Sequence, residues 1–105
     1  MYRLTVLYGR PTDPDAFDAY YRDVHLPIAR RMRGLTHWTL TWVTAQNGED
    51  VPPIHLIADL YAADKAALDA ILASPEGRAA RDDLVNFVTG GATFLEGYEE
   101  EVDLS

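Results

Sequence analysis

Two hydrophobic periodicities alternate along this chain, and their order strongly limits the folds open to it. Four segments are rich in β-branched and aromatic residues or alternate apolar with polar residues, a pattern typical of β-strands. Three others repeat apolar residues every three or four positions, which predicts helices, and the last two of these helices follow each other directly. The predicted strands are residues 2–8, 37–43, 54–62 and 92–102, and the predicted helices are residues 14–33, 65–72 and 75–87.

Capping residues support these helix boundaries. Asp13 precedes Pro14, a proline at the first helical position, and Gly34 can end the same helix in a left-handed conformation. Asp64 and Ser74 can cap the two later helices by accepting a hydrogen bond from a backbone N–H of the first turn. The chain is therefore predicted to run strand, helix, strand, strand, helix, strand.

This order predicts an α+β fold of the ferredoxin-like type, βαββαβ, with a four-stranded antiparallel sheet and its helices on one face. A chain of 105 residues is expected to form one domain, residues 1–105. The other face of the sheet stays uncovered and carries apolar side chains whichever way the sheet turns. A second copy related by a two-fold axis would bury it most simply, so we expect a homodimer that forms a dimeric α+β barrel.

The strand pattern leaves open which face of the sheet the helices cover. If they cover the face that holds Trp38, Leu40 and Trp42, the opposite face lines the dimer. That second set is His37, Thr39, Thr41, His55, Ile57, Asp59 and Tyr61. Protonation of its two histidines would charge the interface, so such a dimer is expected to loosen below about pH 6.

Acidic residues outnumber basic ones, and the formal net charge of −8 repels nucleic acid and anionic membrane surfaces, so we expect neither as a partner. The chain has no cysteine, which excludes disulfides and thiolate metal sites. Residues 1–3 do not begin a signal peptide, and no apolar run approaches the ~18–20 residues of a membrane span. We therefore expect a soluble, cytoplasmic protein.

The first predicted helix carries a histidine inside its apolar face. Apolar residues recur at three- and four-residue intervals from Phe17 to Met32, and His25 lies within this stripe. Tyr21 is one turn before His25, so a phenol and an imidazole can approach the same small molecule. Pro27 lacks an N–H and should kink or restart the helix beside them. The residues alone leave two readings open: a catalytic imidazole, or a buried histidine bonded to a carbonyl or a tyrosine hydroxyl.

Several kinds of chemistry are disfavoured by the residues present. The three histidines have no metal-ligand spacing, so we expect no metal site. Ser74 and Ser105 are the only serines, and both lie in a cap or a tail, which argues against a serine nucleophile. No glycine-rich phosphate loop occurs. Acid–base chemistry by His25 remains, with Tyr21 as the group that holds a substrate oxygen.

Aromatic side chains are the candidates for the walls of a binding site. Each of them is also consistent with a role in the core alone. The substrate-binding candidates are Phe17, Tyr8, Trp38, Trp42 and Phe94.

The chain resembles the EthD family of the dimeric α+β barrel superfamily. The resemblance rests on a Tyr-Tyr-x-x-x-His-x-Pro element at residues 20–27, Gly-Leu at 34–35, Ala-Asp-Leu-Tyr at 58–61 and Ser-Pro-Glu-Gly at 74–77. It implies a homodimer and a hydrophobic cavity in each protomer between the sheet and the helices. The superfamily includes cofactor-free monooxygenases, polyketide cyclases, isomerases and haem-degrading enzymes, so the fold does not determine the reaction. Residues 64–87 contain no histidine, which disfavours the haem-degrading branch.

Two functional hypotheses follow. The first is a cofactor-independent enzyme of the cyclase, dehydratase, isomerase or monooxygenase type, acting on a hydrophobic, aromatic or polyketide-like small molecule with His25 as general acid or base. The second is a non-catalytic carrier of a hydrophobic ligand, or an accessory protein of an oxygenase system, which needs only aromatic walls and one or two polar anchors. Neither hypothesis requires a cofactor, and we expect none.

Overall fold

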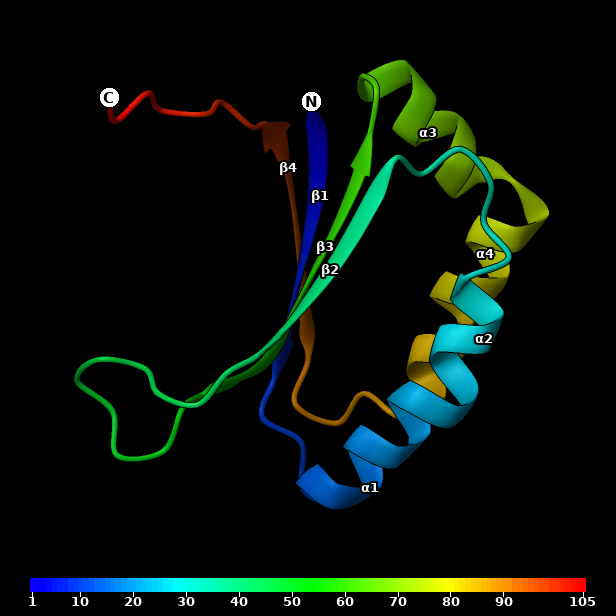
Figure 1. Cartoon of the computed structure of the whole chain (residues 1–105). Coiled ribbons are helices and arrows are strands. Elements are labelled where there is room, and N and C mark those ends of the chain that lie inside the picture. Colours follow the sequence, from blue (N-terminus) through cyan, green and yellow to red (C-terminus); the bar gives the residue numbers. More distant parts are fainter.

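The computed structural model describes residues 1–105 as one antiparallel sheet with helices on a single face (Figure 1). The strands lie in the order β2-β3-β1-β4, so the first strand of the chain is central and the last is at an edge. The elements are β1 (Tyr2–Gly9), α1 (Pro14–Tyr20), the π-helix η1 (Tyr21–His25), α2 (Leu26–Ala29), β2 (His37–Trp42), β3 (Ile54–Ala62), α3 (Lys65–Ala73), α4 (Pro75–Asp82), the 3₁₀-helix η2 (Asp83–Asn86) and β4 (Ala92–Tyr98). The predicted α+β, ferredoxin-like fold is confirmed.

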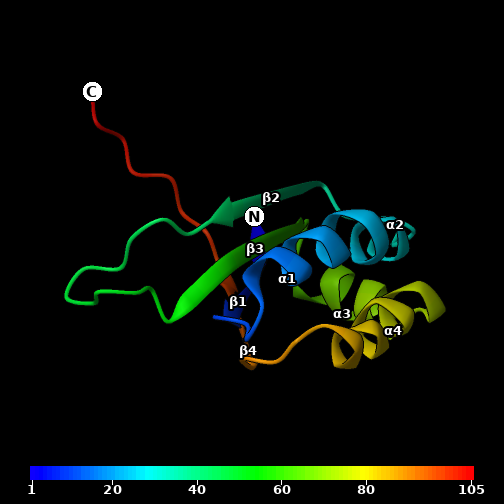
Figure 2. The ribbon, with the colours of Figure 1, turned by 90° about the horizontal axis from the view of Figure 1, so that it is seen from below.

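The strand register determines which side chains meet the helices. Leu40, Ala58, Val6 and Phe94 lie opposite one another in a row across all four strands. Seen from below, the helices form a separate layer beside the sheet, and none lies on its other side (Figure 2). The face that holds Trp38 and its neighbours is therefore the covered one.

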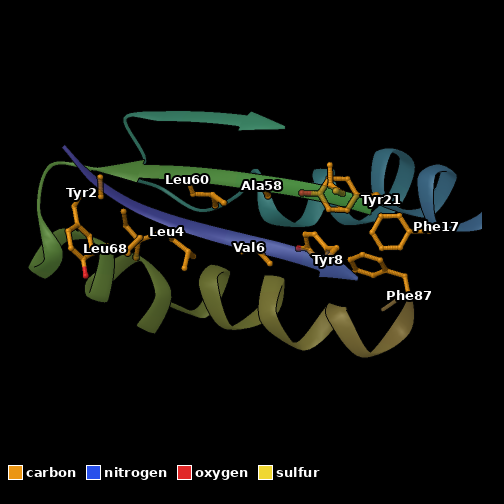
Figure 3. Close-up of a cluster of buried hydrophobic side chains, with 13 residues drawn as sticks. Tyr2, Leu4, Val6, Tyr8, Phe17, Tyr21, Ala58, Leu60, Leu68 and Phe87 are labelled. Carbon is orange, nitrogen blue, oxygen red and sulfur yellow. The ribbon is translucent and has the colours of Figure 1, made fainter. Parts of the chain in front are cut away.

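The core fills the space between the sheet and the helices. Its members from β1 and β3 alternate along each strand and point toward the helices (Figure 3). Aromatic rings gather at one end, where Tyr8, Phe17, Tyr21 and Phe87 lie together. Phe17 and Tyr21 are stacked, with ring centroids 6.0 Å apart.

The first helical segment begins and breaks where the sequence predicts. Asp13 accepts a hydrogen bond from the backbone N–H of Ala16 at 3.1 Å. The break near Pro27 takes the form of a π-helical turn, in which the N–H of Leu26 bonds to the carbonyl of Tyr21. Pro27 then lies in the first turn of α2, where its missing N–H is tolerated.

The second helical segment turns sharply at Ser74. The hydroxyl of Ser74 accepts from the N–H of Gly77 at 3.0 Å and donates to the carbonyl of Ile71 at 2.5 Å. A Cβ at residue 77 would lie 2.2 Å from that carbonyl oxygen, so only glycine fits there. This turn lets α3 and α4 both pack on the sheet.

Three expectations from the sequence are corrected. The first helical segment was expected to reach residue 33, but it ends at Ala29, because the N–H groups of Arg31 and Met32 bond to carbonyls three residues back instead of four. The last strand ends at Tyr98, and Val102 lies in an extended tail with 72% of its surface exposed. His55 was expected on the uncovered face, but its Nε2 lies 2.7 Å from Asp18 on α1 and its ring contacts Phe17. A β-bulge in β3, opposite Tyr8 and Gly9, interrupts the alternation.

None of the helices combines the length and the apolar character that crossing a membrane requires.

Candidate functional site

A cavity of about 250 Å³ lies between the covered face of the sheet and the helices. Most of its lining is hydrophobic, with Ala29 and Met32 on one side and Ala80 and Leu84 on the other. Five of the seven predicted site residues line it: His25, Tyr21, Tyr8, Trp38 and Phe94. The structure thus brings the predicted acid–base pair and three of the five predicted walls to one place.

Phe17 and Trp42 do not line this cavity. Phe17 is buried in the core between Tyr8 and Phe87. Trp42 lies beneath the guanidinium of Arg22, 4.4 Å from the ring centroid, in a cation–π contact. Both rings pack against Tyr21, which does line the cavity.

His25 is held in place by a buried carboxylate. Its Nδ1 lies 2.9 Å from Oδ2 of Asp83, and both side chains are almost completely buried. The other oxygen of Asp83, Oδ1, accepts from the hydroxyl of Tyr20 at 2.7 Å and from Nδ2 of Asn86 at 3.0 Å. Asp83 therefore has no freedom to turn away from His25.

The charges of this pair follow from its surroundings. Burial lowers the pKa of His25, and the neighbouring Asp83 opposes that effect only in part. Burial acts to raise the pKa of Asp83, but hydrogen bonds from Asn86, Tyr20 and His25 outweigh it and hold this pKa below its usual range. At neutral pH the pair is a neutral imidazole and a carboxylate.

The carboxylate also determines the tautomer of His25. An ionised Asp83 can only accept, so Nδ1 of His25 carries the proton and donates it. The lone pair is then on Nε2, which has no hydrogen-bond partner in the protein. The chain has one side-chain nitrogen or oxygen that is both fully enclosed and without a partner, and it is not in His25. Because Nε2 has no partner either, it cannot be fully enclosed and must keep some accessible surface. A free imidazole lone pair beside an apolar cavity is the arrangement of a general base.

Two phenols lie beside this imidazole. The ring centroid of Tyr21 is 5.1 Å from that of His25 and 5.7 Å from that of Tyr8. Burial raises the pKa of both tyrosines well above the ordinary value, so both hydroxyls stay protonated. The two hydroxyls interact with each other, and this interaction affects the pKa of both. Neither hydroxyl bonds to a carboxylate, an amide or a backbone group. They are available to donate to an oxygen in the cavity.

Two charged side chains complete the cavity lining. Arg81 on α4 forms no ion pair in the protein. Glu96 accepts from the hydroxyl of Tyr2 at 2.8 Å and lies 3.5 Å from Nζ of Lys65. Nowhere in the chain do three His, Cys, Asp or Glu side chains converge as metal ligands would. Besides His25 and the two tyrosines, the lining therefore includes a guanidinium without an ion pair and a carboxylate that is already bonded.

Sequence reasoning missed Asp83, although the sequence carried a signal for it. Ala80, Leu84 and Phe87 recur at helical spacing, and Asp83 lies inside this apolar stripe as His25 lies inside its own. An acidic residue on a buried helix face needs a partner. Only the structure shows that the partner is a histidine 58 residues away.

The chain is similar to known proteins both in sequence and in structure. A family model described as the EthD domain matches residues 9–91. The chain is 36% identical, over 97% of its length and 98% of the relative's, to an 11.0 kDa protein of the thcB–thcC intergenic region of Rhodococcus erythropolis. The solved structure of an EthD family protein from Bacillus halodurans is 28% identical, with a TM-score of 0.88 and coverage of 95% of this chain and 99% of that one.

A more distant solved structure shares the fold. It is SnoaB, a cofactor-independent oxygenase from Streptomyces nogalater, crystallised as a variant. It is 13% identical, with a TM-score of 0.64 and coverage of 99% of this chain and 96% of that one.

Proposed function

Because the chain belongs to the EthD family, we propose that it is a cofactor-independent enzyme that removes a proton from a hydrophobic, aromatic or polyketide-like small molecule. One observation carries this proposal: His25 lines an apolar cavity, donates Nδ1–H to a buried carboxylate 2.9 Å away and leaves Nε2 free. A protein of the same fold that is a cofactor-independent oxygenase indicates that this architecture accommodates reactions without a cofactor.

The proposed step is proton abstraction next to a carbonyl group. Nε2 of His25 takes the proton from the substrate carbon, and the electron pair of that C–H bond moves onto the carbonyl oxygen to form an enolate. The hydroxyls of Tyr8 and Tyr21 donate to this oxygen, and Asp83 stabilises the imidazolium that forms. General base catalysis of this kind contributes about 10²–10⁴ in rate. Cyclases, dehydratases and isomerases can all begin with such an enolate.

Hydrogen exchange tests the step without knowledge of the natural substrate. In D₂O near pH 7, the protein is expected to accelerate exchange of the acidic C–H protons of 2-tetralone, an aromatic ketone, followed by NMR. His25→Ala should abolish the acceleration. His37→Ala is the matched control, because His37 is an exposed histidine outside the cavity. Equal exchange by the parent and His25→Ala would contradict the role of His25.

A second function is favoured by the mostly hydrophobic lining of the cavity. The protein would then carry a hydrophobic ligand, or present it to a partner oxygenase, without changing it. Binding of 2-tetralone with no acceleration of exchange in the parent would favour this function over the first.

We also propose that the uncovered face of the sheet pairs with the same face of a second copy. The exposed apolar side chain of Leu95 lies on that face, beside a strand pair whose polar groups bond to one another. Thr5 donates to Asp59 at 2.5 Å, and Arg3 lies 3.0 Å from Glu99. Because these polar groups already bond to each other within one chain, burying them in an interface leaves none of them without a partner.

Light scattering tests this pairing. The parent is expected to have the mass of a dimer at pH 7.5, and Leu95→Arg, which places a charge on the proposed interface, the mass of a monomer. A monomeric parent would refute the proposal. The expected loosening of the dimer below about pH 6 assumed that His37 and His55 both line the interface. His55 bonds instead to Asp18 on α1, so only His37 would add charge to that face.

A further inference from the structure

The indole nitrogen of Trp38 is the only fully enclosed side-chain nitrogen or oxygen in the chain that has no hydrogen-bond partner in the protein. Buried donors are almost always bonded, since an unpaired one loses its hydration without compensation. Each exception therefore needs an explanation. Trp38 lines the cavity that also holds His25, so a ligand that displaces the atoms now covering the nitrogen can supply the missing acceptor.

The position of Trp38 separates it from the two tyrosines. Trp38 pairs with Leu60, which pairs with Leu4 on the central strand. Tyr8 is four residues further along that strand, a distance of about 13 Å at ~3.3 Å per residue. The cavity thus has polar groups at two places with an apolar wall between them.

No charged group of the protein competes for this donor. Glu96 lies in the same row of the sheet, but its Oε1 is engaged by Tyr2 and Lys65, and neither of its oxygens is bonded to the indole nitrogen. Met32 belongs to the same cavity lining, and its flexible side chain can move aside as a ligand approaches the enclosed nitrogen.

We infer that Trp38 selects the ligand by donating its indole N–H to an acceptor oxygen at the end of the molecule remote from His25. This inference rests on the proposed function, because it assumes that the cavity binds an aromatic molecule. The ligand class is then an elongated aromatic compound with two oxygens: one near Tyr8 and Tyr21, and a carbonyl or ether oxygen near Trp38. Hydrocarbons of the same shape should bind more weakly.

A matched pair of compounds tests this role. 6-Acetyl-2-naphthol carries a hydroxyl at one end and an acceptor oxygen at the other, whereas 6-ethyl-2-naphthol has the same skeleton without the acceptor. Trp38 is replaced by 3-benzothienylalanine, which keeps the bicyclic ring and lacks the N–H. We expect the acetyl compound to lose about two- to tenfold in affinity, the range of one neutral hydrogen bond, and the ethyl compound to be unaffected.

The same replacement at Trp42 is the control, because Trp42 does not line the cavity and should leave both affinities unchanged. The chain has two tryptophans, so its spectrum contains two indole N–H signals. The Trp38 signal should shift with the acetyl compound and not with the ethyl compound. Replacement of Trp38 should also leave the unfolding midpoint of the free protein unchanged or raised, since no bond to the protein is lost.

The outcomes separate this inference from the proposed function. If the replacement of Trp38 lowers the affinity of both naphthols equally, the inference is overturned and the proposed function stands. The same holds if the acetyl compound binds without shifting the Trp38 signal. A lowered unfolding midpoint in the free protein would also overturn it, because the N–H would then be bonded within the protein. If neither compound binds to the parent, an aromatic ligand is refuted for both.

Discussion

Replacing Asp83 with asparagine should reverse the proton distribution on His25 while leaving the fold in place. The two bonds to Oδ1, from Tyr20 and Asn86, can be kept, because an amide also has a carbonyl oxygen. At the Oδ2 position, however, the amide presents an NH₂ group to His25. The imidazole must then accept at Nδ1, so its proton moves to Nε2 and the lone pair no longer faces the cavity.

The magnitudes follow from these contacts. A charged acceptor strengthens a hydrogen bond by about 1 kcal/mol relative to a neutral one, and two such bonds to Oδ1 become neutral, so Asp83→Asn should cost about 2 kcal/mol of unfolding free energy. The effect on catalysis should be much larger. Loss of the general base is expected to slow 2-tetralone exchange by about 10²–10⁴. The substitution therefore separates function from stability.

Two measurements check this prediction. Urea unfolding gives the stability, and two-dimensional ¹H–¹⁵N spectra of the histidine ring give the tautomer, which should change from Nδ1–H to Nε2–H. Asp82→Asn is the matched control, since Asp82 is the exposed neighbour and bonds to no side chain. If the tautomer of His25 is unchanged in Asp83→Asn, or is already Nε2–H in the parent, the assignment of His25 as a base held by Asp83 is refuted.

Three other predictions follow from the same contacts. Tyr21→Phe keeps the ring in the core and should cost less than about 1 kcal/mol of unfolding free energy, yet slow exchange of 2-tetralone about tenfold. Burial lowers the pKa of His25 from 6.5 in the folded chain, so the unfolded chain binds more protons below pH 6.5, and urea unfolding should show stability falling as the pH drops from 7 to 5.5; His25→Gln should flatten this slope. Gly77→Ala places a Cβ 2.2 Å from the carbonyl oxygen of Ile71 and should lower stability by about 1–3 kcal/mol, whereas Gly97→Ala, with no atom within 4 Å, should not.

Local patterns were enough to predict most of the fold. Hydrophobic periodicity gave the four strands, and Asp13, Asp64 and Ser74 cap the helices as predicted, because a cap depends on residues within one turn. The end of the last strand at Tyr98 was missed, since β4 is an edge strand and pairs only as far as Tyr2, where its antiparallel neighbour β1 begins. Pairing across a sheet is not a local property.

The site was less predictable because its main contact is not local. His25 and Tyr21 could be identified from one helix, and the break at Pro27 from one residue. The bond between His25 and Asp83 joins two helical segments that only the tertiary structure brings together. The position of His55 was mispredicted because a bulge in β3, where Leu56 pairs with Tyr8 and Ile54 with Gly9, leaves His55 unpaired and changes the alternation that the sequence pattern assumes.

The position of β1 also determines how late in synthesis the sheet can be completed. β1 is synthesised first, yet it lies between β3 and β4, so one of its edges stays unpaired until residue 98 has left the ribosome. Contacts between residues so far apart in sequence form slowly, after the helices have formed from local interactions. The second half of the chain also supplies Asp83, without which His25 has no carboxylate to orient it. A partly synthesised chain therefore exposes an unpaired strand edge before the candidate site is complete, and it is most prone to aggregation during this interval.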